Sequence, residues 1–192
     1  MGLPGSLATM FRRLSSRLLL VAAIGAVQFA AFELALRAWG GTEAAPAFQR
    51  LFVADPDIGY RLQPGVTTRF ETAEFATDIS INAQGTRDDD IGPKAPGEFR
   101  IVVLGDSLVL AVQVPLEQTF CRVLQNRLNR DLEGTGRHVR VINAGVQGYG
   151  PVEEFLFYRN VASRFEADLV LVAIYVANDA VEANASAYRL TG

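Results

Sequence analysis

Three short polar stretches of the sequence could do chemistry together. They are Asp106-Ser107, the glycine-rich loop "GVQGYG" at 145–150, and Asn178-Asp179. A serine hydroxyl can attack an acyl carbon, while closely approaching backbone N–H groups and a side-chain amide can bind the oxyanion that forms. Each stretch alone is a weak signal. Together they are parts of a site for nucleophilic acyl transfer, provided that the fold brings them to one place.

The elements around these stretches predict how they would meet. Apolar runs predict strands at 99–104, 139–143 and 168–176, and helical spacing predicts helices at 116–132 and 152–165. Such a β-α-β-α-β series forms a parallel sheet, and the third apolar run is typical of a strand covered on both faces. Loops after parallel strands emerge at one carboxyl edge, where α/β proteins bind ligands. All three polar stretches follow a predicted strand at that edge.

The segments "IVVLGDSL", "VINAGVQGYG" and "VAND" resemble the first three blocks of the SGNH/GDSL hydrolase family of esterases and acyl hydrolases. The resemblance covers residues 99–179 and implies a flavodoxin-like, three-layer α/β fold, of which this is the first β-α-β-α-β part. It implies a lipid, carbohydrate or other small-molecule ester as substrate, no cofactor and no metal ion.

The resemblance also assigns roles. Ser107 would be the nucleophile, and the oxyanion hole would be formed by the backbone N–H groups of Ser107 and Gly148 and the side chain of Asn178. Supporting positions would be Gly105, Asp106, Gly145 and Asp179. The family pattern Gly-x-Asn-Asp reads Val-Ala-Asn-Asp here, so the backbone path beside Asn178 departs from the family at the missing glycine.

A second departure concerns the base, which in the family is a histidine of an Asp-x-x-His block. The only histidine of this sequence, His138, precedes the second predicted strand. Five strand residues place it roughly 16 Å from the carboxyl edge, whereas a general base must lie near 3 Å from the hydroxyl. Lys94 is at the same wrong edge, and Asp179 is expected to brace the asparagine loop. We therefore expect weak or no activity, and expect 99–192 to be the amino-terminal part of a longer hydrolase domain.

The amino terminus has the pattern of a membrane anchor. Arg12, Arg13 and Arg17 precede an apolar run at 18–36, whose 19 residues would rise roughly 28 Å as a helix. The positive flank predicts that residues 1–17 stay cytoplasmic and that the chain after residue 36 is extracytoplasmic, periplasmic in a bacterium. A cleaved signal peptide and a buried helix of a soluble protein are the alternatives.

Residues 37–98 are expected to form an extracytoplasmic connector, turn-rich at 55–65 and with a pair of short strands within 66–85. The acid run Asp88-Asp89-Asp90 is expected to be a solvated loop rather than a metal site. Cys121 is expected to be a small buried hydrophobe. The net charge of −3 indicates no basic surface for nucleic acid.

The sequence is compatible with two functional classes. One is a membrane-anchored serine ester hydrolase, and the other is a catalytically inactive membrane protein that uses a degenerate domain of this kind for binding or assembly. Nucleotide binding ranks third, because "GVQGYG" lacks the Gly-x-Gly-x-x-Gly spacing and follows the second strand rather than the first.

Overall fold

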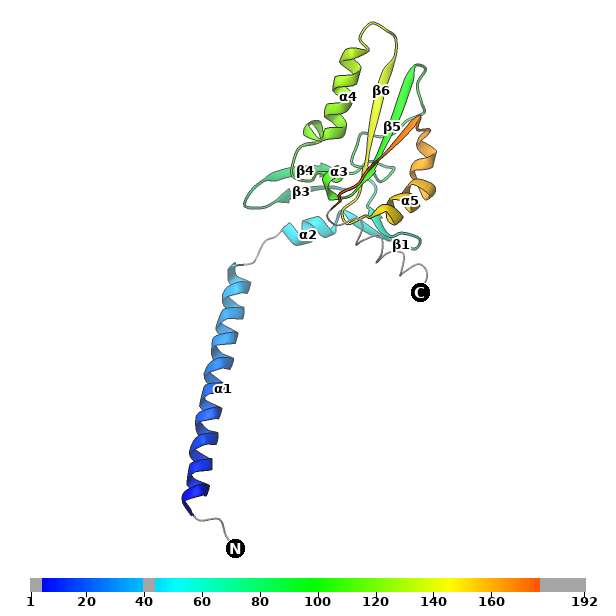
Figure 1. Ribbon diagram of the computed structural model, residues 1–192. Coiled ribbons are helices and arrows are strands. Elements are labelled where there is room, and N and C mark those ends of the chain that lie inside the picture. The colour runs from blue at the N-terminus through cyan, green and yellow to red at the C-terminus, as the bar shows by residue number, and fades with distance from the viewer. Residues whose placement is uncertain (1–4, 40–43, 177–192) are drawn as a thin grey trace. The chain divides into compact units, whose positions relative to one another are not determined.

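The computed structural model describes residues 5–39 and 44–176, which fall into two units divided near residue 42 (Figure 1). The first unit contains one long helix, α1 (Gly5–Trp39). Its segment Leu18–Leu36 has a mean hydropathy of 2.1 and is long and apolar enough to cross a membrane. The large side chains along this segment are exposed, for example Leu19 at 71% and Phe29 at 71%.

The second unit is a mixed α/β domain built on a parallel three-stranded sheet. Its strands are β5 (Glu98–Gly105), β6 (His138–Gly145) and β7 (Leu169–Ala173), in the order β6-β5-β7. The predicted β-α-β-α-β series and its parallel sheet are therefore confirmed. The register aligns the carboxyl ends of the three strands, because Gly105 of β5 pairs with both Gly145 of β6 and Ala173 of β7.

Helices cover the two faces of the sheet, α4 (Phe120–Asp131) on one side and α5 (Pro151–Asn160) on the other (Figure 1). Alternate residues of a strand face opposite sides, so Ile101 and Val103 pack with Cys121 of α4. Val102 and Leu104 pack with Phe157 of α5. The prediction that Cys121 is buried is confirmed.

Both predicted helices are shorter than expected because each is preceded or followed by a 3-10 turn. A turn at η1 (Leu116–Gln118) ends at Thr119, whose hydroxyl caps α4 by accepting from Arg122 N at 3.4 Å. Beyond α5 the chain forms η2 (Ala162–Phe165). Pro151 opens α5 at its first helical position, as expected.

Strand β7 is shorter and more exposed than the sequence predicts. It pairs with β5 alone among the described strands, and Leu169 and Val172 are 42% and 50% exposed. The expectation that both of its faces are covered is therefore wrong for the described part of the chain. Helix α4 packs mainly on β6, at the other edge of the sheet, and of β7 only Ala173 joins the cluster that contains Cys121 of α4.

The connector folds onto this sheet as a short helix and two antiparallel hairpins. The elements are α2 (Ala44–Gln49), β1 (Phe52–Asp55), β2 (Gly59–Leu62), β3 (Thr67–Glu71) and β4 (Ala76–Ser80). The predicted pair of strands within 66–85 is confirmed as β3 and β4. Its buried Leu51, Leu62 and Ile79 belong to the same core as Val102 and Phe157, so the connector is part of the α/β domain.

Candidate functional site

Ser107 lies at the carboxyl end of the first predicted strand, as expected, and the structure places this strand in the centre of the sheet. Strand β5 ends at Gly105, and Ser107 is the first residue of the one-turn helix α3 (Ser107–Leu110). Asp106 is buried and caps this helix, because its Oδ1 accepts a hydrogen bond from Leu108 N at 2.8 Å. Ser107 itself is half-buried, and its hydroxyl has no hydrogen-bond partner among the described residues.

Two glycines allow α3 to sit directly on the strand ends. A Cβ atom on Gly145 would lie 2.5 Å from Leu110 N and 2.6 Å from Val109 Cβ, and one on Gly105 would overlap with Val109 Cγ2. Contacts this short do not occur, so any side chain at either position would push α3 away from the sheet. Both residues therefore fix the place of Ser107 by having no side chain.

Asn143, which is completely buried in β6, holds α3 against the ends of the strands through hydrogen bonds. Its Nδ2 donates to Val109 O at 2.8 Å, and its Oδ1 accepts from Gly145 N at 3.1 Å. One side chain thus satisfies a carbonyl of α3 and an N–H at the start of the glycine loop. Sequence reasoning missed Asn143, and its place directly before "AGVQGYG" was the available signal.

The glycine loop after β6 lies at the same edge as Ser107. Val146 N donates to Gly105 O at 3.0 Å, which joins the loop to the end of β5. Gly148 has φ +72°, a conformation that favours glycine, and a Cβ there would lie 2.9 Å from Tyr60 Oη. The structure therefore brings Gly145 and Gly148 to the edge that carries Ser107.

Tyr60 and Tyr149 connect this loop to the connector hairpin. The Tyr60 hydroxyl donates to Gln147 O at 2.7 Å, and the Tyr149 hydroxyl donates to Tyr60 O at 2.6 Å. Burial raises the pKa of Tyr149, so this hydroxyl stays a neutral donor. Sequence reasoning missed both tyrosines, because their partners are 87 and 89 residues away in the chain.

The third predicted stretch, Asn178-Asp179, lies outside the described residues. Strand β7 ends in register with Gly105, so the chain approaches the shared edge. The structure thus brings together the first two of the three stretches.

His138 and Lys94 lie at the opposite, amino edge, as predicted. His138 starts β6, and its Nε2 is 3.8 Å from Glu98 Oε2 at the start of β5. The seven residue steps along β6 separate it from Gly145 by about 23 Å. Lys94 Nζ pairs with Asp168 Oδ1 at 2.6 Å, just before β7. Neither side chain can act as a base for Ser107.

The prediction that the acid run is solvated is wrong for its first member, Asp88, whereas Asp89 and Asp90 are exposed as expected. Asp88 is only 8% exposed, and its Oδ2 accepts from Asn143 N at 3.0 Å. Its Oδ1 lies 3.3 Å from an Arg122 guanidinium nitrogen. Burial raises the pKa of Asp88, and the N–H of Asn143 and the charge of Arg122 oppose that shift. Among the described residues no group of acids, histidines and cysteines is arranged to hold a metal ion.

Arg87, also unpredicted, is 1% exposed and reaches the far end of α3. One guanidinium nitrogen donates to Leu110 O at 2.7 Å and to Ala111 O, and another donates to Val114 O at 2.6 Å. Burial lowers its pKa. The turn that follows Ser107 is therefore held by a buried cation from the connector.

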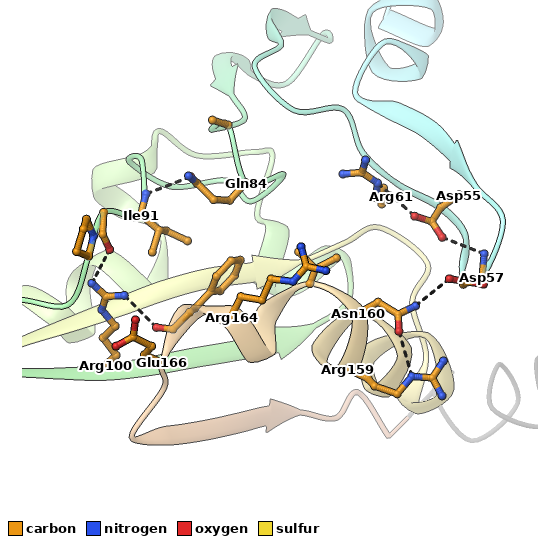
Figure 2. A pocket seen from close by; sticks show the side chains of 15 residues that line it. Asp55, Asp57, Arg61, Gln84, Ile91, Arg100, Arg159, Asn160, Arg164 and Glu166 are labelled. Atoms are coloured by element: carbon orange, nitrogen blue, oxygen red, sulfur yellow. Dashed lines mark hydrogen bonds and ion pairs between the residues drawn. The ribbon is translucent and has the colours of Figure 1, made fainter.

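A cleft of about 930 Å³, shown in Figure 2, is lined by residues other than Ser107. It is bordered by the β1–β2 turn, the segment 83–93 and residues 159–166. Several of its polar groups bind one another: Arg61 pairs with Asp55 at 3.3 Å, and Asn160 donates to Asp57 at 3.3 Å. None of the residues predicted to do chemistry lines this cleft.

The chain matches no protein-family model, and no curated protein has a significantly similar sequence. The function must therefore be inferred from where the structure places this chain's own residues.

Proposed function

We propose that this protein is a membrane-anchored serine ester hydrolase of the SGNH/GDSL type. The observation that carries the proposal is the place of half-buried Ser107 at the carboxyl end of the central parallel strand, next to the glycine loop that contains Gly148. Its hydroxyl has no hydrogen-bond partner in the part of the chain that the structure describes. The strand order, second-first-third, also suits a flavodoxin-like sheet, in which ligands bind at the carboxyl edge where the strand order reverses.

In the proposed reaction, Ser107 Oγ attacks the ester carbonyl carbon, and its proton passes to a base. The carbonyl oxygen becomes an oxyanion, which the N–H groups of Ser107 and Gly148 and the Asn178 amide would bind. The alcohol then leaves with a proton, and water cleaves the acyl-serine. The substrate class is an acyl or acetyl ester of a lipid or a carbohydrate. No nucleic acid, cofactor or metal ion takes part.

The general base is not identified, because the one histidine of these 192 residues, His138, does not lie near Ser107. Serine is a poor nucleophile without a base. A site with a triad member removed keeps roughly 10³–10⁴-fold catalysis over water from its oxyanion hole and from binding. We therefore expect slow hydrolysis by the chain itself, and faster hydrolysis when imidazole is added as an external base.

The test is hydrolysis of p-nitrophenyl acetate by the full chain in detergent micelles, with and without imidazole. We expect Ser107→Ala to remove both the slow rate and the imidazole-dependent increase above the protein-free background. His138→Ala is the matched control and should keep both rates. Mass spectrometry should find an acetyl group on Ser107 in the wild type. Equal rates for Ser107→Ala and wild type would overturn the assignment.

The anchor is a separate part of the proposal. We propose that Leu18–Leu36 spans the membrane once, with residues 1–17 in the cytoplasm because Arg12, Arg13 and Arg17 flank the segment. The protein should then stay with membranes in alkaline carbonate and keep its amino-terminal residues. Loss of residues before position 37 from the mature protein would instead identify a cleaved signal peptide.

One observation favours a second candidate, a catalytically inactive binding or assembly protein. The sequence's one histidine is bound at the amino edge, about 23 Å from the edge that carries Ser107. In this case the wild type and Ser107→Ala would both hydrolyse the ester no faster than the protein-free background. Retention of ester analogues by the wild type without their turnover would then support binding.

A further inference from the structure

We propose that Arg87 is a positioning residue for Ser107, a role that rests on the proposed function. Arg87 touches no reacting atom and acts through the turn at 110–114. Its guanidinium donates to three carbonyls of this turn, those of Leu110, Ala111 and Val114. A planar group with five N–H donors can bind several carbonyls at once from one fixed position, which an ammonium on a flexible stem cannot do.

The same turn is bonded directly to the nucleophile segment. Leu110 N donates to Asp106 O at 3.0 Å, and Ala111 N donates to Ser107 O at 2.8 Å. The N–H groups of Leu110 and Ala111 therefore hold Asp106 and Ser107, while their carbonyls are held by Arg87. A displacement of the guanidinium would be passed through two peptide groups to the backbone of Ser107.

The turn needs an external support for two reasons. Helix α3 has only four residues, and a single turn is not stable by its own hydrogen bonds. In addition, Ala111 has φ +52°, a left-handed conformation that is unfavourable for a residue with a Cβ. Strain of this kind persists where neighbouring groups fix the backbone, and Arg87 binds the carbonyl of Ala111 itself.

A gain in stability alone does not explain an arginine at this place. Arg87 is 1% exposed, and it forms no ion pair with a carboxylate among the described residues. Removal of such a cation from water is costly, and an apolar side chain of similar volume often serves a core at least as well. What the arginine adds is a fixed set of carbonyl contacts behind Ser107.

The neighbouring Asp88 extends the support to the oxyanion side. Its carboxylate accepts from Asn143 N, and the Asn143 side chain binds both Val109 O and Gly145 N. The adjacent pair Arg87-Asp88 thus holds the turn after Ser107 and the strand end before the glycine loop. This pair comes from the connector, which sequence reasoning placed outside the catalytic domain.

The test compares Arg87→Lys with a matched control, Arg100→Lys, in the full chain in micelles. Arg100 is 2% exposed and also donates to two backbone carbonyls, Phe165 O at 3.0 Å and Gly92 O at 2.8 Å, but it lies near the amino edge. The first readout is amide hydrogen exchange. We compare the increase in exchange rate over wild type at each amide. In Arg87→Lys this increase should be at least ten times larger at Leu110 and Ala111 than at Val103 of β5. Arg100→Lys should show no such selective change.

The second readout is ester hydrolysis with added imidazole. We expect Arg87→Lys to lower kcat at least tenfold with KM within about twofold, because the nucleophile is misplaced while the binding surface is kept. Introducing Ala111→Gly into Arg87→Lys should restore much of the slow exchange and of kcat, since glycine adopts positive φ without strain. If Arg87→Lys does not fold, recovery of folding by Ala111→Gly supports the proposal, and failure to recover overturns it.

Equal exchange changes in Arg87→Lys and Arg100→Lys would overturn the positioning role, as would an unchanged kcat in an active protein. If the wild type hydrolyses no ester, the proposed function fails by itself. The exchange experiment then still shows whether Arg87 holds the turn that carries Ser107.

Discussion

Replacement of Gly145 by alanine should displace α3 and lower the stability of the domain. The added Cβ would meet Leu110 N at 2.5 Å, Val109 Cβ at 2.6 Å and Val109 C at 2.8 Å. Two of these three atoms belong to the backbone of α3, so the contacts cannot be relieved by rotation of a flexible side chain. Either α3 or the end of β6 must move.

The size of the effect follows from these contacts. Extra methyl groups in a well-packed core cost about 1–3 kcal/mol, and contact with a backbone that Asn143 and Arg87 hold in place belongs at the upper end, about 3 kcal/mol. A change of 1 kcal/mol moves the midpoint of thermal unfolding by roughly 2–4 °C in a domain of this size. We therefore expect Tm to fall by about 6–12 °C.

Two other glycines supply matched controls. Around Gly92 and Gly134 an added Cβ would meet no atom within 4 Å, but Gly134 has φ +79° whereas the φ of Gly92 lies outside the left-handed region. Gly92→Ala should therefore be neutral or slightly stabilising, through the lower entropy of the unfolded chain. Gly134→Ala should lower the free energy of unfolding by about 1 kcal/mol, because an alanine is strained in this left-handed conformation.

The assay is urea and thermal unfolding of the full chain in micelles, followed by near-ultraviolet circular dichroism. The buried Tyr149 reports the packing of the sheet edge. If Gly145→Ala unfolds within about 0.5 kcal/mol of Gly92→Ala, a difference usual for neutral surface changes, then α3 does not sit on the strand ends as described. Gly145 would then not fix the position of Ser107 in the way described.

Three further predictions concern single side chains. Asn143→Ala should destabilise the domain by about 2–4 kcal/mol in urea unfolding, because two buried backbone groups lose their partner; a loss below 1 kcal/mol would contradict the role of Asn143 in holding α3. The thiol of Cys121, whose pKa burial raises to about 12, should resist iodoacetamide at pH 8 in the native protein and react in urea, and rapid native labelling would show that the α4 face is open. The hydrogen bond from Lys94, followed by that from Arg100 N, lowers the pKa of Asp168 below its usual 3.8. The ionised carboxylate therefore stabilises the folded protein above pH 3.8. This contribution is lost as the pH falls through the lowered pKa. Asp168→Asn should therefore flatten the loss of stability below pH 4, and an unchanged pH profile would refute the pairing.

The sheet and the position of Ser107 were predictable because they depend on local patterns. Apolar runs that end in glycine marked β5 and β6, and Pro151 marked the start of α5. The parallel arrangement follows from the alternation of strands and helices, and it predicts that His138 and Lys94 lie at the amino edge, away from Ser107.

The contribution of the connector could not be predicted in the same way. The segment 55–65 contains turn signals, yet it includes β2 and the turn of the first hairpin, where Asp55 Oδ1 accepts from Asp57 N and Ile58 N. A run of three acids is usually solvated, but Asp88 is buried because a backbone N–H of β6 and an arginine of α4 meet it there. Partners far apart in sequence leave no local pattern, and Arg87, Asp88 and Tyr60 all have such partners.

These distant pairings have a consequence for synthesis. Tyr60 leaves the ribosome well before Gln147 and Tyr149, which follow 87 and 89 residues later. At roughly 5–20 residues per second, the β1–β2 hairpin waits about 4–18 s before its partners exist. During that interval Leu51 and Leu62, both fully buried in the finished domain, have no sheet to pack against. The connector is thus the first part of the domain to be made and among the last to be completed, so its apolar side chains stay exposed longest during synthesis.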